Sequence, residues 1–417
     1  MKYIFVIPSI CNIGGAQLYL VNKINYLEEN GWDVDVIYAR KDICRIKQLE
    51  KYIHNCFPYI NYSTMYYRQS YVESKVNNIC RKLAVSPEEE VILESCTVSI
   101  STWAEIIASK LGAKHICFAF EELFEMSRSQ LDFAYYKHIR HELAGISDYA
   151  VPLMFKNSKY VIQSPEVYGA RPLPSIGDVE HSLTSQLTSY DIVIGSFGRL
   201  DKGFVWTALE EMKQYYERRS KGKYAVLLIG DTKDNLFKKK IYALFEGLAD
   251  VYITGEIWPV SRELVKCVNV FVSTSGAASS TAIEGVPTIA INPETFKPNG
   301  ILDYTTSCTL NDPHPDHRLI NELLEDIIDK NYCKFHQSKG LYVDFYKKKR
   351  LENWAEFDRQ MTIAQDYRAP KEYYDVFKIS LEGKRKYASY ISKIFGFKAF
   401  VKVIAFAQKY YGTLIRG

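Results

Sequence analysis

A run of small residues between two apolar segments is the part of this sequence best suited to binding an anion. Residues 270–292 read VFVSTSGAASSTAIEGVPTIAIN, which predicts a strand, a tight turn, a short helix and a second strand. Small side chains let backbone N–H groups approach a ligand closely, and the helix directs its positive end to the same place, as a phosphate or diphosphate requires. The candidate binding residues are Ser275, Gly276, Ala277, Ala278, Ser279 and Ser280. The alternative is a plain strand-to-helix connection with a serine cap.

Two further loops combine glycines with a helix start. The sequence GSFGRLDKG places Arg199 and Lys202 after a predicted strand, where they can neutralise a diphosphate and where arginine can bind two oxygens. Gly14 and Gly15 follow the first predicted strand and open the next helix. Ordinary surface cations and a tight turn are the alternative interpretations. The Gly14 loop lacks the G-x-G-x-x-G pattern, and no acidic residue ends the second strand, which argues against a nicotinamide cofactor.

The alternation of short apolar runs with helix-period segments predicts two α/β domains that position these loops. Residues 1–165 are the predicted N-terminal Rossmann-like domain, 166–190 a linker, and 191–340 the C-terminal Rossmann-like domain. The predicted strands are 3–8, 34–38, 90–94, 114–120, 149–152, 160–163, 192–197, 224–229, 251–254, 268–273 and 288–291. The predicted helices include 16–30, 102–111, 205–221, 235–247, 260–266 and 317–329. Each domain is a doubly wound parallel sheet, and we expect ligands in a cleft at the carboxyl ends of the strands.

The C-terminal part of the sequence has a different character. Residues 341–370 predict a helix that crosses back to the N-terminal domain, and residues 371–417 predict a basic amphipathic helical tail. If the tail is helical, three of its lysines lie on one side and three of its apolar residues lie on a neighbouring side. This pattern is typical of a helix lying on an anionic membrane. These residues are Lys398, Lys402 and Lys409, and Phe397, Val401 and Ile404. The alternative is a helix that packs on the protein and leaves its lysines in solvent.

Composition limits the classes of function further. A net charge of +4 over 417 residues argues against a nucleic-acid-binding protein. Nine cysteines without a C-x-x-C pair predict reduced thiols in a cytoplasmic protein. The opening MKYIFVIPSICNIGG predicts a buried strand rather than a signal peptide, because Pro8 interrupts a short apolar run. No run reaches the roughly 18 apolar residues of a membrane-spanning helix.

Several motifs, in their order and spacing, resemble the GT-B glycosyltransferases, specifically the retaining nucleotide-sugar enzymes of glycosyltransferase family 4 (group 1). The resemblance covers about residues 1–365 and implies a GT-B fold, with two Rossmann-like domains facing a cleft. The motifs are IGGAQLYLVNKINYLEENGWDVDVIYA, GRLDKG, LLIGD, VYITGEIWPVSRELVKCVNVFVSTS and GVPTIAIN.

The resemblance also implies a role for particular residues. It implies a UDP-sugar as co-substrate, transfer with retention of configuration, and no required metal or other cofactor. The residues in contact with the donor would be Gly14 and Gly15 at the phosphate and sugar, Arg199 and Lys202 at the diphosphate, and Glu256 and Ile257 beside the nucleobase.

Two regions depart from the family pattern. Where the family usually carries two glutamates eight positions apart (E-x7-E), this chain has Val272 and Ser280, and Glu284 lies at the predicted helix end. Where relatives often show a His-acid pair after the fourth predicted strand, this chain has Glu121 and Glu122. This pair is the candidate catalytic pair, because it could stabilise a developing oxocarbenium charge or orient the acceptor hydroxyl. Alternatively, the two glutamates complement a helix dipole.

Two sets of residues look like metal ligands but have simpler explanations. Asp33 and Asp35 form a D-x-D at the start of the second predicted strand, away from the carboxyl-end edge, which favours a solvated strand face. His314, Asp316 and His317 lie where a polar loop leads into a predicted helix, which favours a loop and cap. We therefore predict no metal site.

Together these features predict an enzyme that transfers a sugar from a nucleoside diphosphate sugar to a glycan or lipid-linked acceptor. The predicted setting is surface polysaccharide biosynthesis, such as capsule assembly, in the cytoplasm and peripherally on the inner face of the cell membrane. Two alternatives stay open. One is a non-catalytic GT-B partner subunit, and the other is a GT-B epimerase or hydrolase acting on the nucleotide sugar itself.

Overall fold

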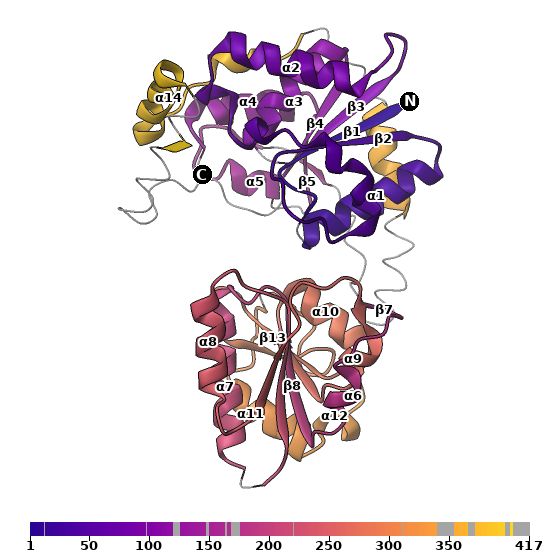
Figure 1. Ribbon diagram of the computed structural model, residues 1–417, viewed down its shortest axis with the longest axis vertical. Helices are drawn as coiled ribbons and strands as arrows, with labels where there is room; N and C mark the ends of the chain where they lie inside the picture. Colours follow the sequence, from indigo (N-terminus) through magenta and orange to yellow (C-terminus); the bar gives the residue numbers. More distant parts are fainter. Residues whose placement is uncertain are drawn as a thin grey trace. The chain divides into compact units, whose positions relative to one another are not determined.

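The computed structural model describes residues 1–402 except 12, 97, 120–125, 147–149, 163–164, 168–175, 220, 311, 340–353, 366–371 and 397–400. The chain divides into two compact units (Figure 1). The first unit contains Met1–Pro172 and Glu352–Gly417, and the second contains Leu173–Leu351. Each unit is built around one six-stranded sheet.

The first unit has a parallel sheet with the strand order β2-β1-β3-β4-β5-β6. Every residue of β1, β3 and β4 is buried, as expected for strands covered on both faces. The strands are β1 (Lys2–Ile7), β2 (Asp33–Tyr38), β3 (Val91–Ser95), β4 (Lys114–Ala119), β5 (Leu143–Gly145) and β6 (Glu166–Val167).

Helices cover both faces of this sheet. Helices α2 and α3 pack on one face, where Trp103 of α3 is fully buried, and α1 packs on the other, where Tyr19 stacks on Phe118 of β4 at 5.1 Å between ring centroids. The helices are α1 (Gly15–Glu29), α2 (Gln69–Leu83), α3 (Val98–Leu111), α4 (Arg128–Ile139) and α5 (Ala150–Met154), with shorter turns η1 (Lys47–Asn55), η2 (Pro58–Asn61) and η3 (Thr64–Tyr66).

The C-terminal segment completes the first unit. A helix at 354–365 packs on α1, and Tyr26 contacts the rings of Trp354 and Phe357 at 5.4 and 5.3 Å. A short turn η5 (Val376–Lys378) then leads to α14 (Gly383–Phe395), which ends at Gly396 with a φ of 83°. Gly396 therefore ends this helix, because left-handed backbone is accessible to glycine at no steric cost.

The second unit has the strand order β10-β9-β8-β12-β13-β14, in which only β14 is antiparallel among the described strands. The strands are β8 (Ile192–Phe197), β9 (Tyr224–Ile229), β10 (Asp250–Ile253), β12 (Val270–Ser273), β13 (Thr288–Ile291) and β14 (Pro298–Ile301), with a separate pair β7 (Ile176–Gly177) and β11 (Val260–Ser261). Helices α7, α8 and α11 pack on one face, and α6 and α9 on the other. The helices are α6 (Thr184–Leu187), α7 (Gly203–Glu217), α8 (Asn235–Leu244), α9 (Arg262–Lys266), α10 (Ser275–Ile283), α11 (Ile320–Leu324) and α12 (Tyr332–Phe335), with a π-helical turn η4 (Glu325–Asp329).

Some of the predicted elements differ from those observed. The predicted strand 149–152 is wrong, because residues 150–154 form α5, in which Pro152 lies in the first turn and needs no hydrogen-bond donor. Residues 160–162 of the predicted strand 160–163 are not in a strand, and β6 pairs with β5 instead. The predicted helix 260–266 begins with β11, because its first two residues pair with β7. The predicted helix 317–329 starts at α11 and continues as η4.

Two glycines bring the loops after β8 and β9 into contact. The N–H of Gly198 donates to the carbonyl of Ile229 at 2.9 Å, and the N–H of Leu200 donates to the carbonyl of Asp231 at 3.1 Å. Gly230 has a φ of 148°, and a Cβ at this position would lie 1.9 Å from the carbonyl oxygen of Gly198. This contact between two backbones therefore excludes any side chain.

We predict that Gly230→Ala destabilises the protein by about 3 kcal/mol, because the methyl group separates the two loops and the backbone angle is strained. Urea unfolding measures this change. Gly276→Ala is the matched control in the same unit, since a Cβ at Gly276 would meet no atom within 4 Å. The control is expected to stay within about 1 kcal/mol of the wild type. Equal stability of the two variants would contradict the close contact.

Candidate functional site

Four loops of the second unit leave one edge of its sheet. Strands β8, β9, β10 and β12 are parallel, so their carboxyl ends meet at this edge. The loops are hydrogen-bonded to one another as well. The N–H of Gly230 donates to Oγ1 of Thr254 at 3.3 Å, and the N–H of Phe197 donates to Oγ of Ser273 at 3.0 Å. We call this edge, with its four loops, the strand-end edge.

The loop after β8 supplies the two predicted cations. The guanidinium of Arg199 is 68% exposed and contacts the carboxylate of Asp201 at 2.9 and 3.4 Å. Lys202 caps the start of α7 and is half-buried. Burial lowers the pKa of Lys202, and the charge of Arg199 lowers it further. The charge of Asp201 acts in the opposite direction and raises this pKa. Within the described part of the chain no side chain or carbonyl is hydrogen-bonded to the Lys202 ammonium, so the ammonium is open to a bound anion.

The loop after β12 leads directly into α10. Ser275 has a φ of 55°, and its N–H donates to the carbonyl of Thr309 at 2.8 Å. The N–H groups of Gly276 and Ala277 lie in the first turn, where a helix offers them no backbone acceptor. Gly276 is exposed, with open space where a Cβ would be. These two N–H groups are the donors that α10 can present to an anion.

The serine hydroxyls of α10 point elsewhere. Ser280 Oγ donates to the carbonyl of Gly276 at 2.8 Å, and Ser279 Oγ donates to that of Ser275 at 3.4 Å. Ala278, Ser279 and Ser280 are all buried. These residues therefore position the backbone of α10 at the strand-end edge, and their hydroxyls do not face a ligand.

The loop after β10 carries the residues predicted beside a nucleobase. Gly255 has a φ of 75° and pairs with Gly230 through an antiparallel bridge. Glu256 and Ile257 are both half-buried, and Ile257 packs on the apolar cluster beneath the sheet. The structure thus places both residues at the strand-end edge, beside the loop after β9.

Gly14 and Gly15 lie at the start of α1 in the first unit. Gly14 is extended, with a φ of −165°, and its carbonyl accepts from the N–H of Leu18 at 3.0 Å. A Cβ at Gly14 would lie 3.2 Å from Oε1 of Gln17. Gly14 is half-buried and Gly15 is exposed. The predicted contact of this loop with a ligand stays a prediction.

Some predicted site residues lie outside the described residues. These are Glu121 and Glu122 of the candidate catalytic pair, and Phe397, Lys398, Ile404 and Lys409 of the tail. Val401 and Lys402 are described and helical, and Lys402 is exposed.

The residues that resembled metal ligands have protein partners. Lys2 Nζ contacts Asp33 at 2.9 Å and Asp35 at 2.8 Å. Asp316 pairs with Arg318 at 2.6 Å. Among the residues that the structure describes, no cluster of three or more His, Cys, Asp or Glu side chains could hold a metal ion. In the same residues, no helix is long and apolar enough to cross a membrane.

Solved structures with a similar fold include glycosyltransferases. One is a glycosyltransferase from Rickettsia africae, with a TM-score of 0.59, 14% identity, and coverage of 88% of this chain and 98% of that chain. The Anabaena protein HepE in complex with UDP has a TM-score of 0.58, 14% identity and coverage of 88% and 100%. The lipopolysaccharide outer core galactosyltransferase WaaB has a TM-score of 0.51, 15% identity and coverage of 87% and 99%. The fold is that of the GT-B glycosyltransferases. This confirms the predicted fold class, while no family model and no curated protein matches the sequence.

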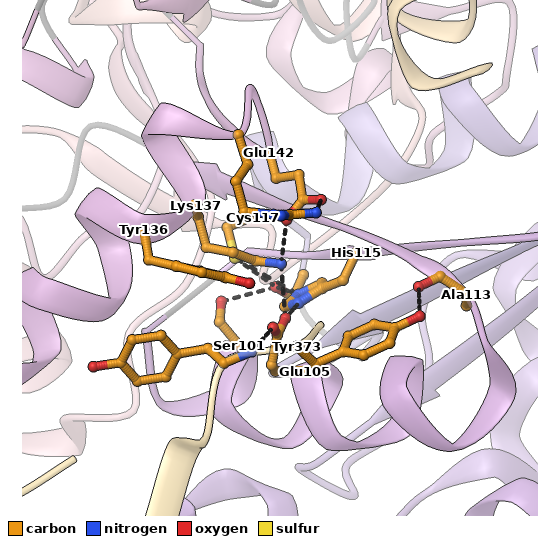
Figure 2. A network of polar contacts seen from close by, with 12 residues as sticks. Ser101, Glu105, Ala113, His115, Cys117, Tyr136, Lys137, Glu142 and Tyr373 are labelled. Carbon is orange, nitrogen blue, oxygen red and sulfur yellow. Dashed lines mark hydrogen bonds and ion pairs between the residues drawn. The ribbon is translucent and has the colours of Figure 1, made fainter. Parts of the chain in front are cut away.

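The first unit of this GT-B fold contains a buried polar network that the sequence did not reveal (Figure 2). His115 Nδ1 lies 2.6 Å from Glu105 Oε2, and Lys137 Nζ lies 2.7 Å from the same oxygen and 2.8 Å from Glu142. Ser95 Oγ lies 2.8 Å from His115 Nε2. All five side chains are almost fully buried. The network therefore joins β3, β4, α3 and α4 through charges that water does not reach.

The charges in this network shift one another's pKa. Burial alone would raise the pKa of Glu105, but the Lys137 ammonium and the hydrogen bond from His115 hold it at about 2. Burial alone would lower the pKa of His115, but contacts with Cys117 and Glu105 raise it. The His115 ring, in turn, lowers the pKa of the Cys117 thiol against the effect of burial. These side chains are closed to solvent, so their charges pair with one another and not with water.

The sequence signal that could have indicated this network is His115, a polar residue inside the predicted buried strand KHICFA. The other four residues of the network, Ser95, Glu105, Lys137 and Glu142, belong to other segments of the chain, so spacing alone could not identify them. Periodic patterns report which face of an element is buried but not which distant polar groups meet there.

We predict that Glu105→Gln destabilises the protein by about 3–5 kcal/mol at pH 7, because it leaves the Lys137 ammonium buried beside a neutral group. The pKa of Glu105 is about 2 in the fold and 4.5 ordinarily. The ionised carboxylate therefore stabilises the fold above about pH 4.5, and this contribution is lost as the pH falls toward 2.

Urea unfolding between pH 2 and pH 7 measures both effects. Glu88→Gln is the matched control, since Glu88 is an exposed glutamate of the same unit. We expect the stability difference between wild type and Glu105→Gln to shrink as the pH falls. A difference that is the same at pH 3 and pH 7 would contradict the assigned pKa.

Proposed function

We propose that this protein transfers a sugar from a nucleoside diphosphate sugar, most simply a UDP-sugar, to a glycan or lipid-linked acceptor. The observation that carries the proposal is the half-buried Lys202 ammonium, unpaired within the described residues, at the sheet edge where α10 also begins. Strands β8 and β12 are adjacent in the sheet, so α7 and α10 both start at the edge where these strands end. Two helix N-termini and two cations suit a diphosphate.

The chemistry of the leaving group explains why these groups are needed. When the glycosidic bond to the donor breaks, the negative charge grows on the diphosphate. Lys202 would bind one phosphate. The Arg199 guanidinium would leave the exposed carboxylate of Asp201 and bind two phosphate oxygens instead. The N–H groups of Gly276 and Ala277 would hold the charge that remains.

The remaining roles follow the predicted assignment. Gly14 and Gly15 would contact the phosphate and sugar of the donor, and Glu256 and Ile257 the nucleobase. Reaction with retention of configuration, without a required metal, is part of the proposal, as are Glu121 and Glu122 near the reacting sugar. HepE in complex with UDP and the lipopolysaccharide outer core galactosyltransferase WaaB support a UDP-sugar donor and an acceptor in surface polysaccharide biosynthesis, such as capsule assembly. The proposed location is cytoplasmic, at the inner face of the cell membrane.

A second candidate function is nucleotide-sugar binding without transfer, as a partner subunit. The residues at the two positions where glycosyltransferase family 4 usually has glutamates favour this second function. Val272 is fully buried in β12, and Ser280 is buried in α10. Glu284 lies at the end of α10 and pairs with Arg262 at 2.7 Å, away from the helix start. No described residue of α10 itself is a carboxylate, so catalysis depends on groups elsewhere.

We predict that Lys202→Ala and Arg199→Ala each weaken UDP binding at least about tenfold, because each removes a charge-assisted contact. Isothermal titration calorimetry with UDP measures the affinity. Lys213→Ala is the matched control, since Lys213 lies on the same helix and pairs with Glu217 at 3.0 Å on the surface. Unchanged affinity in both site variants would remove the main support for the proposal.

Turnover of UDP-sugars separates the candidate functions. Release of UDP that depends on an added acceptor would support transfer. Tight UDP binding without turnover would favour the partner subunit, and free or epimerised sugar without an acceptor would favour a hydrolase or epimerase.

A further inference from the structure

Helix α14 turns its apolar side chains away from the protein. An ordinary surface helix buries its apolar stripe and exposes its polar face. In α14 the exposed fractions are 72% for Tyr387, 55% for Tyr390, 39% for Ile391, 63% for Ile394 and 70% for Phe395. The spacing of three and four residues places these five side chains on one side of the helix. We call this surface the α14 stripe.

The opposite side of α14 is polar and is the side that packs on the protein. Ser389 and Ser392 are 8% and 2% exposed, and Ser389 Oγ donates to the carbonyl of Met65 at 2.5 Å. Arg68 Nε donates to the carbonyl of Lys393 at 2.6 Å near the end of the helix. The helix is thus held by hydrogen bonds to the segment around η3, and its orientation does not depend on burying the stripe.

The segment before α14 fixes the helix at its other end. The hydroxyls of Ser127 and Ser129 donate to the carbonyl of Ser380 at 2.9 and 2.8 Å, and the N–H of Arg128 donates to Glu382 Oε1 at 3.0 Å. Figure 1 shows α14 at the periphery of the first unit. A helix fixed at both ends with its apolar side outward presents a preformed surface.

The charge beside the stripe identifies the kind of partner. Lys384, Lys386 and Lys393 are exposed, and no acidic residue occurs between Gly383 and Phe395. Lysine stems can lie along an apolar surface while their ammonium groups reach phosphate headgroups, and tyrosine places an apolar ring and a polar hydroxyl at the same boundary. Apolar side chains flanked by lysines on a single convex helix fit a flat anionic bilayer.

We propose that α14 docks the protein on an anionic phospholipid membrane, with the α14 stripe at the boundary between headgroups and acyl chains. The proposal assigns a surface to the membrane location proposed above, but it does not rest on glycosyl transfer, since it holds whatever reaction the protein performs. The α14 stripe precedes the tail residues 397–409 that the sequence predicts to bind the membrane, so the two predictions concern different residues. Because the stripe is already exposed, docking requires no rearrangement of the first unit.

Flotation of the full-length chain with phosphatidylcholine vesicles, with and without phosphatidylglycerol, tests this docking. We expect the wild type to float with the anionic vesicles and to be released by high salt. Ile394→Ser/Phe395→Ser should weaken partitioning at least about tenfold. Lys384→Gln/Lys386→Gln/Lys393→Gln should weaken it roughly 100-fold on anionic vesicles.

Ile139→Ser/Phe335→Ser is the matched control, because these side chains are 57% and 75% exposed on α4 and α12. It should float like the wild type, and all variants should keep the wild-type melting temperature and UDP affinity. The proposal is overturned if the wild type does not float, or if the Ile394/Phe395 variant floats as well as the control. A wild-type dimer that the same variant converts to monomers would assign the stripe to a second copy of the chain and would also overturn it.

Discussion

The parallel register of β8, β9, β10 and β12 is the constraint on which the candidate site depends. Because these strands run the same way, four loops leave the same sheet edge, and the glycine contact between Gly198 and Gly230 holds two of them together. Helices α7 and α10 then both start at this edge. Their dipoles and first-turn N–H groups create a positive environment before any side chain is considered, and Arg199 and Lys202 add to it.

The buried network of the first unit helps to hold the C-terminal segment of that unit in place. Glu105, held ionised by Lys137 and His115, also accepts from the backbone N–H of Tyr374 at 2.9 Å, and the hydroxyl of Tyr373 donates to the carbonyl of Ala113 at 2.9 Å. From there Val376, Ile379 and Leu381 are buried against α4 and α5, and α14 follows. Interior charges thus help to fix the segment that orients an exposed apolar helix at the surface.

The two positions that a resemblance to glycosyltransferase family 4 would fill with glutamates are not acidic in this chain. At the equivalent positions Val272 belongs to the apolar core and the Ser280 hydroxyl bonds within its own helix, so α10 faces a ligand with N–H groups alone. Such an edge is suited to stabilising a departing diphosphate. Any group that assists at the sugar must come from another part of the chain, which makes acceptor-dependent turnover the informative measurement.

The sequence by itself determined the alternation of strands and helices, the glycine and cation loops, and the strand, turn and helix at 270–292, because these follow from local periodicity and backbone sterics. It misassigned residues 149–152 as a strand, where residues 150–154 form α5, since a short apolar run fits a strand or a buried helix equally well. Three features could be seen only in the tertiary structure. The α10 serine hydroxyls donate to carbonyls of their own helix, Glu105 pairs with both His115 and Lys137, and α14 exposes its apolar side. The orientation of α14 depends on contacts between residues far apart in the sequence, such as Ser389 with Met65, and the buried network joins residues of different elements. No local pattern encodes such contacts.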